Sequence, residues 1–204
     1  MTHKTFGLDN MKHLVIIGTG NIGQIVHWYA TLCKDYMTEW DIKCHIDDVE
    51  NYTIEADDVF ICADVKTTDR LEHASVIRAK GGTFINVIHP TANLAPTAQL
   101  GTGIIVGAFT TISINTTIKD DVIIQNHCNI GHDGIIESGS HLYVGVKLCG
   151  RNKVGEQSAL FTGSLIYPDV KVGVGCTVGA GSVVSRKVKD GDTVLGNPAK
   201  KIEL

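Results

Sequence analysis

The sequence lacks the features that would direct it to a membrane or to nucleic acid. Its 204 residues contain no apolar run of the roughly 18 residues that cross a bilayer, and the opening MTHKTFGLDN has no apolar core of a secretion signal. Eighteen Lys and Arg stand against 22 Asp and Glu, giving a net charge of −4 and no basic surface for nucleic acid. We therefore expect a cytoplasmic protein that neither enters membranes nor binds nucleic acid.

The six cysteines form no C-x-x-C pair, which argues against a redox motif or a zinc site built from such pairs. In a chain expected to stay in the cytoplasm they are interpreted as reduced thiols. We assign none of them to catalysis and expect no metal. The cysteines are Cys33, Cys44, Cys62, Cys128, Cys149 and Cys176.

A branched aliphatic residue occupies every sixth position from Leu94 to Val184. A helix repeats every 3.6 residues and a strand every 2, so a period of six matches neither; it is typical of the hexapeptide β-helix. Each hexad predicts a short parallel strand and a corner, and three hexads make one coil. Residues 18 apart then lie on neighbouring coils, about 4.8 Å apart. The position two before each aliphatic residue is small or β-branched in most hexads, which places Cys128 and Cys176 inside the coil.

The residues before this repeat predict alternating strands and helices around a glycine-rich turn. Such alternation predicts a small, Rossmann-like parallel sheet. Strands are expected at 14–17, 42–46, 58–63 and 83–87, and helices at 24–32 and 67–80. The predicted division of the chain is a loose tail at 1–11, the α/β domain at 12–88, the parallel β-helix at 89–190 and a C-terminal tail at 191–204.

The turn Gly18-Thr19-Gly20-Asn21-Ile22-Gly23 has the G-x-G-x-x-G spacing between a strand and a helix. It is either a phosphate site at a helix N-terminus or simply a tight turn. Asp47 follows 24 residues after Gly23, near the spacing of an acid that binds a ribose hydroxyl. About 75 residues form only half of a dinucleotide fold, which favours a mononucleotide or a nucleotide sugar over NAD.

The phase of the hexads places His132 and Asp133 at an outer corner, after the inward Ile130. Gly150 lies one coil further, where it leaves space beside the imidazole and offers an N–H to a developing oxyanion. A His-Asp dipeptide is alternatively just exposed surface. A second column, Gly145, Gly163 and Gly181, predicts either a groove for a thin ligand such as pantetheine or relief of corner strain.

The segment from His132-Asp133-Gly134-Ile135-Ile136 to His141-Leu142-Tyr143-Val144-Gly145 resembles the signature of nucleotide-sugar N-acetyltransferases of the PglD/NeuD type, which serve bacterial glycan synthesis. The resemblance runs from the glycine turn to the closing Gly-Asn-Pro-Ala-Lys. It implies a homotrimer of left-handed β-helices with active sites between subunits. It also implies acetyl-CoA as co-substrate and a nucleotide-linked amino sugar as acceptor.

The resemblance also implies roles for individual residues. His132 matches the general base, Asp133 the acid that orients it, and Gly150 the oxyanion donor. Acetyl-CoA is expected along the column of Gly145, Gly163 and Gly181, at His141, Thr162 and Ala180. The nucleotide sugar is expected at Gly20, Asn21, Ile22, Asp47, Asp48 and Ala63. Ile22 and Ala63 stand where the family often has histidine and glycine. The basic residues Arg186, Lys187, Lys200 and Lys201 either meet the CoA phosphates or form a solvated tail.

Three other functions compete with this interpretation. An O-acetyltransferase would use the same fold and the same His-Asp pair on a sugar hydroxyl. A γ-carbonic-anhydrase-like zinc enzyme would use His127 and His132, but its third ligand position holds Thr91 and the set is incomplete. An NAD-binding protein would leave the outer groove unused.

Overall fold

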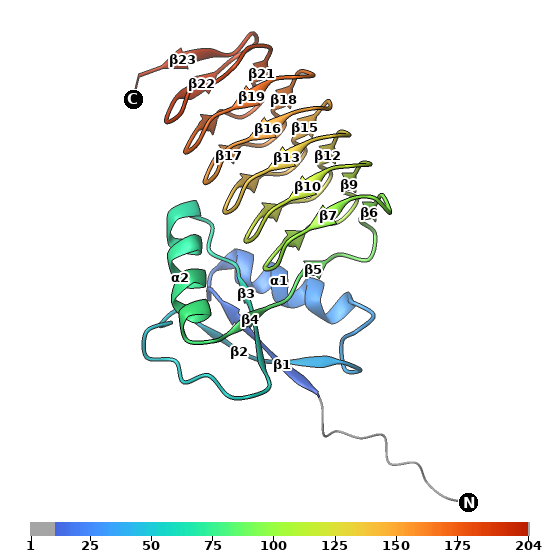
Figure 1. The fold of residues 1–204 in the computed structure, drawn as a ribbon, viewed down its shortest axis with the longest axis vertical. Helices are drawn as coiled ribbons and strands as arrows, with labels where there is room; N and C mark the ends of the chain where they lie inside the picture. Colours follow the sequence, from blue (N-terminus) through green and yellow to red (C-terminus); the bar gives the residue numbers. More distant parts are fainter. Residues whose placement is uncertain (1–10, 204) are drawn as a thin grey trace, which may run out of the picture.

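The computed structural model describes residues 11–203, which form two units stacked end to end (Figure 1). A small sheet with two helices lies at one end, and a coil of short strands makes up the rest. The tail expected at 1–11 lies outside the described residues except for its last residue.

The first unit is a four-stranded parallel sheet in the order β2-β1-β3-β4, with one helix on each face. Leu14 and Ile16 of β1 pack under α1, whereas Val15 and Ile17 pack under α2. Because successive side chains of a strand point to opposite faces, a sheet covered on both sides requires the unbroken apolar run found in β1. The elements are β1 (Lys12–Ile17), α1 (Asn21–Leu32), β2 (Trp40–Ile46), β3 (Asp58–Cys62), α2 (Thr67–Ala79) and β4 (Thr83–Phe84).

The second unit has three sheets that share each turn of the coil. Their strands pair in parallel at steps of 18 residues, as where Ile124 pairs with both Val106 and Leu142. The eight-stranded sheet contains β5 (Val87–Ile88), β8 (Ile105–Val106), β11 (Ile123–Ile124), β14 (His141–Leu142), β17 (Ala159–Leu160), β20 (Thr177–Val178), β22 (Thr193–Leu195) and β23 (Lys200–Ile202).

The two other sheets have six and five strands. The six-stranded sheet contains β6 (Asn93–Leu94), β9 (Thr111–Ile112), β12 (Asn129–Ile130), β15 (Lys147–Leu148), β18 (Leu165–Ile166) and β21 (Val183–Val184). The five-stranded sheet contains β7 (Gln99–Leu100), β10 (Thr117–Ile118), β13 (Ile135–Ile136), β16 (Lys153–Val154) and β19 (Lys171–Val172). The stacked parallel sheets confirm the β-helix expected from the period of six and fit its left-handed form.

The interior of the coil shows why the repeat tolerates polar residues at its small positions. From Val106 to Val184 the aliphatic residue of each hexad is buried, whereas Leu94 and Leu100 in the first hexads are partly buried. Several hydroxyls beside these residues bond to corner carbonyls, although Ser164 Oγ has no partner among the described residues. Thr110 Oγ1 donates to the carbonyl of Gln125 at 2.7 Å, and Ser158 Oγ donates to that of Gly173 at 2.6 Å. A buried hydroxyl with a partner avoids the cost of an unmade hydrogen bond. Cys128 and Cys176 are buried at this position, as expected.

Strands β1 and β2 each begin two residues earlier than expected, and three further local features differ from the sequence expectation. Helix α1 begins at Asn21 rather than at residue 24, because the turn leads directly into it. The strand expected at 83–87 is two strands: β4 ends at Phe84, and Val87 already belongs to the coil. The side chain of Asn86 bonds to Gly101 and Ile104 between them and turns the chain. Residues 191–203 carry β22, which extends the coil beside β20, and the antiparallel β23.

The two units share one hydrophobic core. Val87, Ile105 and Ile123 point outward from the coil yet are buried, because α1 covers this part of the eight-stranded sheet. Further along the same ladder the outward residues are His141, Ala159 and Thr177. Neither helix within residues 11–203 has the length and apolar character needed to span a membrane.

Candidate active site

The residues predicted to be catalytic, His132 and Asp133, form a pair at the corner after β12. Nδ1 of His132 lies 2.6 Å from Oδ2 of Asp133. Asn115, one coil earlier, donates from Nδ2 to the other carboxylate oxygen at 3.1 Å. His132, followed by Asn115, lowers the pKa of the Asp133 carboxyl. The carboxylate therefore holds the Nδ1–H tautomer, which leaves the lone pair of Nε2 facing outward as a base.

Gly150 lies beside the reactive nitrogen of this pair. A Cβ built at Gly150 would be 2.9 Å from Nε2 of His132, and the φ of +141° disfavours any L side chain. The glycine therefore keeps Nε2 accessible, as the spacing of 18 predicts. Its N–H, however, donates to Oδ1 of Asn152 at 3.0 Å inside the coil. The oxyanion role expected for this N–H is not supported, because the donor is already engaged.

The glycine column follows the eight-stranded sheet, at a different corner from His132. Gly145, Gly163 and Gly181 have φ of +74°, +70° and +64°, and a Cβ at Gly163 or Gly181 would meet no heavy atom within 4 Å. Thr162 and Ala180 are exposed beside them. Phe109 and His127 occupy the same corner position with φ of +56° and +58°. Corner strain therefore does not demand glycine here, which favours an open groove.

A single chain does not bring His132 together with the glycine column. His132 follows β12 of the six-stranded sheet, whereas Gly145 follows β14 of the eight-stranded sheet. The two corners are separated by a full side of the coil. A site that uses both must either extend across this side or take one of the two corners from a second copy of the chain.

His141 does not face a ligand as expected, because it is fully buried. Its ring stacks on Tyr143 with centroids 3.9 Å apart, and Tyr143 stacks on Phe161 at 4.5 Å. Burial, aided by the charge of Arg70, lowers the pKa of His141 to about 3. The imidazole is neutral at physiological pH. The hexad phase correctly places it on the outside of the coil, but only the tertiary structure shows that the first unit covers it.

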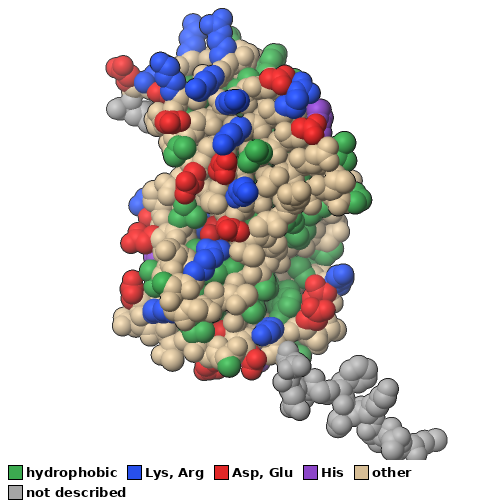
Figure 2. Space-filling model, in the orientation of Figure 1, with side chains coloured by type: hydrophobic (Ala, Val, Ile, Leu, Met, Phe, Trp, Pro, Cys, Tyr) green, Lys and Arg blue, Asp and Glu red, His purple; other side chains and the backbone are tan. Residues whose placement is uncertain are grey.

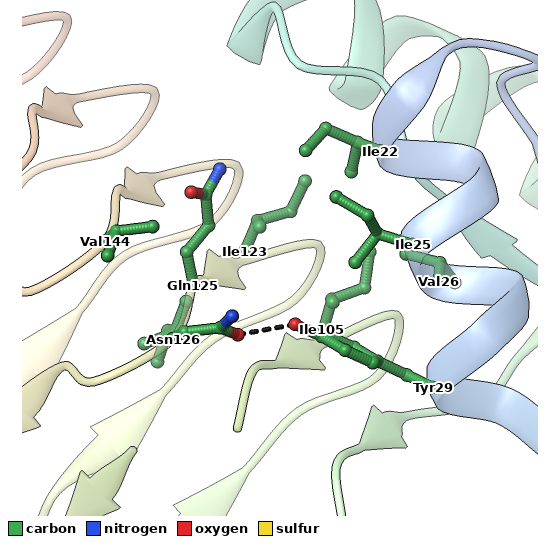
Figure 3. Close-up of a pocket in the computed structure, with 10 residues that line it drawn as sticks. Ile22, Ile25, Val26, Tyr29, Ile105, Ile123, Gln125, Asn126 and Val144 are labelled. Carbon is green, nitrogen blue, oxygen red and sulfur yellow. Dashed lines mark hydrogen bonds between the residues drawn. The ribbon is translucent and has the colours of Figure 1, made fainter. Parts of the chain in front are cut away.

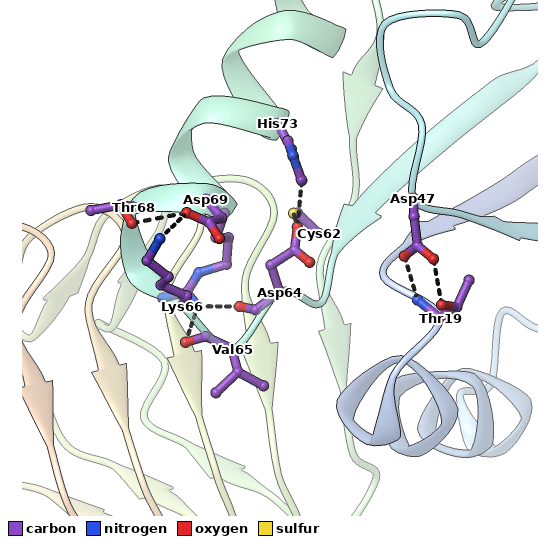
Figure 4. Close-up of polar contacts among 10 residues, drawn as sticks. Thr19, Asp47, Cys62, Asp64, Val65, Lys66, Thr68, Asp69 and His73 are labelled. Atoms are coloured by element: carbon purple, nitrogen blue, oxygen red, sulfur yellow. Dashed lines mark hydrogen bonds and ion pairs between the residues drawn. The ribbon is translucent and has the colours of Figure 1, made fainter.

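Asp47 holds the glycine turn of the first unit through two hydrogen bonds to Thr19 (Figure 4). Its carboxylate accepts from Thr19 N at 2.9 Å and from Thr19 Oγ1 at 2.5 Å. Gly20 precedes α1 without a side-chain cap, so the first N–H groups of the helix are open to an anion. A Cβ at Gly23 would lie 2.0 Å from the carbonyl oxygen of Gly18, so this glycine permits the close approach of helix and strand.

The other expected nucleotide residues take different positions. Asp48 bonds to Asn51, and Ala63 is buried at the end of β3, donating its N–H to the carbonyl of Ile17. Sequence reasoning missed Asp64, which follows β3 and lies 2.7 Å from His73 Nδ1 (Figure 4). The rule that ligands bind at the carboxyl ends of parallel strands is the signal that would have found Asp64.

A cavity of about 100 Å³ lies between α1 and the coil (Figure 3). Helix α1 contributes Ile22, Ile25 and Tyr29, and the coil contributes Gln125 and Val144 among others. The cavity is therefore bounded by the glycine turn on one side and by the residue before Gly145 on the other. It lies between the two sets of residues at which the sequence predicts ligands.

No protein-family model matches the chain. Among curated proteins, it is 29% identical over 141 residues to a serine acetyltransferase of Buchnera aphidicola, which covers 66% of this chain and 47% of the relative. It is 32% identical over 123 residues to the bifunctional protein GlmU of Acinetobacter baylyi, covering 57% of this chain and 26% of that protein. The chain thus spans less than half the length of these curated relatives.

Solved structures match over almost the whole chain. The acetyltransferase domain of PglB from Neisseria gonorrhoeae superposes with a TM-score of 0.87 at 27% identity, covering 94% of this chain and 100% of that one. The same domain in complex with acetyl coenzyme A gives 0.84 at 26% identity, with the same coverage. A variant of perosamine N-acetyltransferase from Caulobacter crescentus, in complex with CoA and GDP-perosamine, gives 0.85 at 26% identity, covering 94% and 97%. The resemblance inferred from the sequence is confirmed.

Proposed function

We propose that this hexapeptide-repeat acyltransferase transfers the acetyl group of acetyl-CoA to the amine of a nucleotide-linked amino sugar. The observation that carries the proposal is the open Nε2 of His132, whose Nδ1 is held by Asp133. A base fixed in one tautomer and left accessible on its other nitrogen suits proton removal from an attacking amine. The solved complexes with acetyl coenzyme A and with GDP-perosamine support both substrates.

The reaction needs no covalent enzyme intermediate. The amine nitrogen attacks the thioester carbonyl and forms the N–C bond, while Nε2 of His132 accepts the amine proton. Collapse of the tetrahedral adduct breaks the C–S bond, and the same proton passes to the CoA thiolate. Asp133 stabilises the transient imidazolium and keeps the ring oriented, as the acid of a hydrolase triad does. Gly150 contributes by leaving Nε2 uncovered.

The site is completed by a neighbouring subunit in a homotrimer. In this arrangement acetyl-CoA lies along Gly145, Thr162, Gly163, Ala180 and Gly181 of one subunit and reaches His132 of the next. Lys and Arg side chains gather at the C-terminal end of the coil, where the exposed Arg186, Lys187, Lys200 and Lys201 suit the CoA phosphates (Figure 2). His141 is buried and is therefore not assigned to contact with acetyl-CoA.

The Rossmann-like unit, from β1 to β4, binds the nucleotide sugar, and the coil that begins at β5 carries the transfer chemistry. The phosphates meet the uncapped start of α1 at Gly20 and Asn21, where backbone N–H groups and the helix dipole favour an anion. Ile22 lines the cavity that receives the sugar. Asp47 and Asp48 are assigned to the nucleoside, and Ala63, whose backbone lies beside Gly18 of the glycine turn, is assigned to the same site.

Transfer to a sugar hydroxyl is the second candidate. The curated relatives include an O-acyltransferase of UDP-N-acetylglucosamine, whose name gives transfer to an oxygen, and a serine acetyltransferase. The same His132 and Asp133 would serve an oxygen nucleophile, which needs the base more because a hydroxyl is less nucleophilic than a neutral amine.

Thiol release from acetyl-CoA tests the proposal, with UDP-, dTDP- and GDP-linked amino sugars and their hydroxyl analogues as acceptors. We expect amine-dependent release with one nucleotide and a loss of about 100-fold or more in kcat for His132→Asn. His13→Asn is the matched control, because Nδ1 of His13 on β1 lies 2.7 Å from Oδ1 of Asp41 on β2 and forms a similar pair away from the proposed site. Release only with hydroxyl analogues would establish the second candidate, and wild-type turnover by His132→Asn would remove the base.

A further inference from the structure

The cavity between α1 and the coil has an apolar wall and two amide side chains (Figure 3). Ile25 and Val144, each 38% exposed, show where it opens to the surface. Oδ1 of Asn126 accepts from the hydroxyl of Tyr29 and from the N–H of Ala108 at 3.0 Å, so this amide is fixed. The cavity contains no charged side chain among the residues that line it. It therefore suits an uncharged part of a ligand.

The orientation of the second amide, Gln125, is set by His141 behind it. Nδ1 of His141 lies 3.3 Å from the carbonyl oxygen of Val65, which can only accept, so Nδ1 carries the proton. Nε2 of the neutral ring is then an acceptor. The side-chain nitrogen of Gln125, 2.9 Å away, donates to it. The oxygen of the Gln125 amide is consequently the end that remains for a ligand.

Arg70 fixes the carbonyl on which this orientation depends. It is a fully buried arginine whose hydrogen bonds all go to backbone carbonyls. Nη1 donates to Asp64 at 2.6 Å and also faces Val65 at 3.5 Å. The other nitrogens donate across the unit boundary to the coil, to the carbonyls of Asp121, Gly139 and Ser140. The five N–H donors of a guanidinium thus tie the loop after β3 to two turns of the coil.

We propose that Gln125 is a specificity residue whose amide oxygen accepts a hydrogen bond from a neutral N–H or O–H group of the bound sugar. His141 and Arg70 are positioning residues that keep this oxygen, rather than the amide nitrogen, facing the cavity. The inference rests on the proposed function and deepens it, since it names the group that the acceptor must present. An apolar cavity of about 150 Å³ holds a six-atom ring, so about 100 Å³ here holds roughly four non-hydrogen atoms of the sugar.

Gln125→Met tests the inference, because methionine has a similar length but cannot accept this hydrogen bond. The parent acceptor is the amino sugar with the fastest thiol release. Its analogues each lack one N–H or O–H donor away from the reacting amine. We expect Gln125→Met to lower kcat/KM for the parent about 10- to 100-fold, mainly through KM. With the wild type, kcat/KM for one analogue should be lower than for the parent by the same factor. With Gln125→Met, kcat/KM for that analogue and for the parent should be equal.

The positioning residues make a separate part of the test. His141→Phe releases the amide nitrogen of Gln125 and should weaken discrimination between the parent and that analogue about 10-fold, with the melting temperature measured alongside. Arg70→Lys should retain part of the discrimination and Arg70→Met should lose it. Gln99→Met is the control, because Gln99 is exposed on β7 in another sheet. Gln99→Met should leave the ratio of kcat/KM between the parent and each analogue unchanged.

The outcomes separate this inference from the proposed function. If no nucleotide-linked amino sugar supports thiol release, the proposed function fails and the inference falls with it. If release occurs but, for every analogue, kcat/KM falls relative to the parent by the same factor in the wild type and in Gln125→Met, only the role of Gln125 is refuted. If the effects of Gln125→Met and of removing one sugar donor are coupled, and if His141→Phe abolishes this coupling, the roles of both Gln125 and His141 are supported.

Discussion

Replacing Gly150 by alanine probes the geometry around His132 with a single methyl group. The added Cβ would lie 2.9 Å from Nε2 and 3.2 Å from Cδ2 of His132. Favourable packing begins at about 3.5 Å, so one of the two groups must move. Movement of the imidazole would break its 2.6 Å contact with Asp133. If the ring stays in place, the methyl group covers Nε2, the nitrogen proposed to accept the proton.

Both outcomes reduce turnover rather than binding. A displacement of about 1 Å costs roughly 100-fold, and complete loss of general base catalysis costs about 100- to 10,000-fold. We therefore expect kcat of Gly150→Ala to fall within this range. The φ of +141° adds a stability loss of about 1–3 kcal/mol. Thiol release measures the first effect, and thermal unfolding measures the second.

A matched control separates the steric effect from the backbone effect. Gly175 has a φ of +61°, and a Cβ there would meet no heavy atom within 4 Å. The left-handed φ of Gly175 is one that L residues also adopt at these corners, so Gly175→Ala should lose less stability than Gly150→Ala and keep its turnover. A folded Gly150→Ala protein with more than about half of the wild-type kcat would refute the placement of Gly150 beside a catalytic base.

Two further predictions concern the charges of the site. Asp133→Asn should lower kcat about 10- to 100-fold at unchanged acetyl-CoA affinity, because an amide no longer stabilises the imidazolium; equal turnover would show that the pair is only surface. The burial of His141 should make the stability of the protein sensitive to acid. The pKa of His141 is near 6.5 in the unfolded state and about 3 in the folded state. Between these pH values only the unfolded state binds the proton. Stability then falls as pH drops below about 6.5, by up to about 1.4 kcal/mol per pH unit, and His141→Phe should show a flatter dependence in urea unfolding at pH values from about 7 to 4. A dependence identical to that of the wild type would mean that His141 is not held neutral by burial.

Features that repeat, or that depend only on spacing along the chain, could be predicted from the amino-acid sequence. The period of six fixed the β-helix, because an inward aliphatic residue at every sixth position has one regular solution. The step of 18 placed Gly150 beside His132, because equivalent residues stack on neighbouring turns. The glycine turn between a strand and a helix was likewise recognisable from local chemistry.

Tertiary structure alone decided which outward residues are exposed. Ile123 and His141 occupy the same outward ladder of one sheet, and both are buried because the first unit packs over them. The contact of Arg70 with carbonyls of the coil joins residues 51 to 70 positions apart. The engagement of the Gly150 N–H by Asn152 depends on a side-chain rotamer inside a corner. Such contacts follow from how two units close on each other, and no period or motif in the chain specifies that packing.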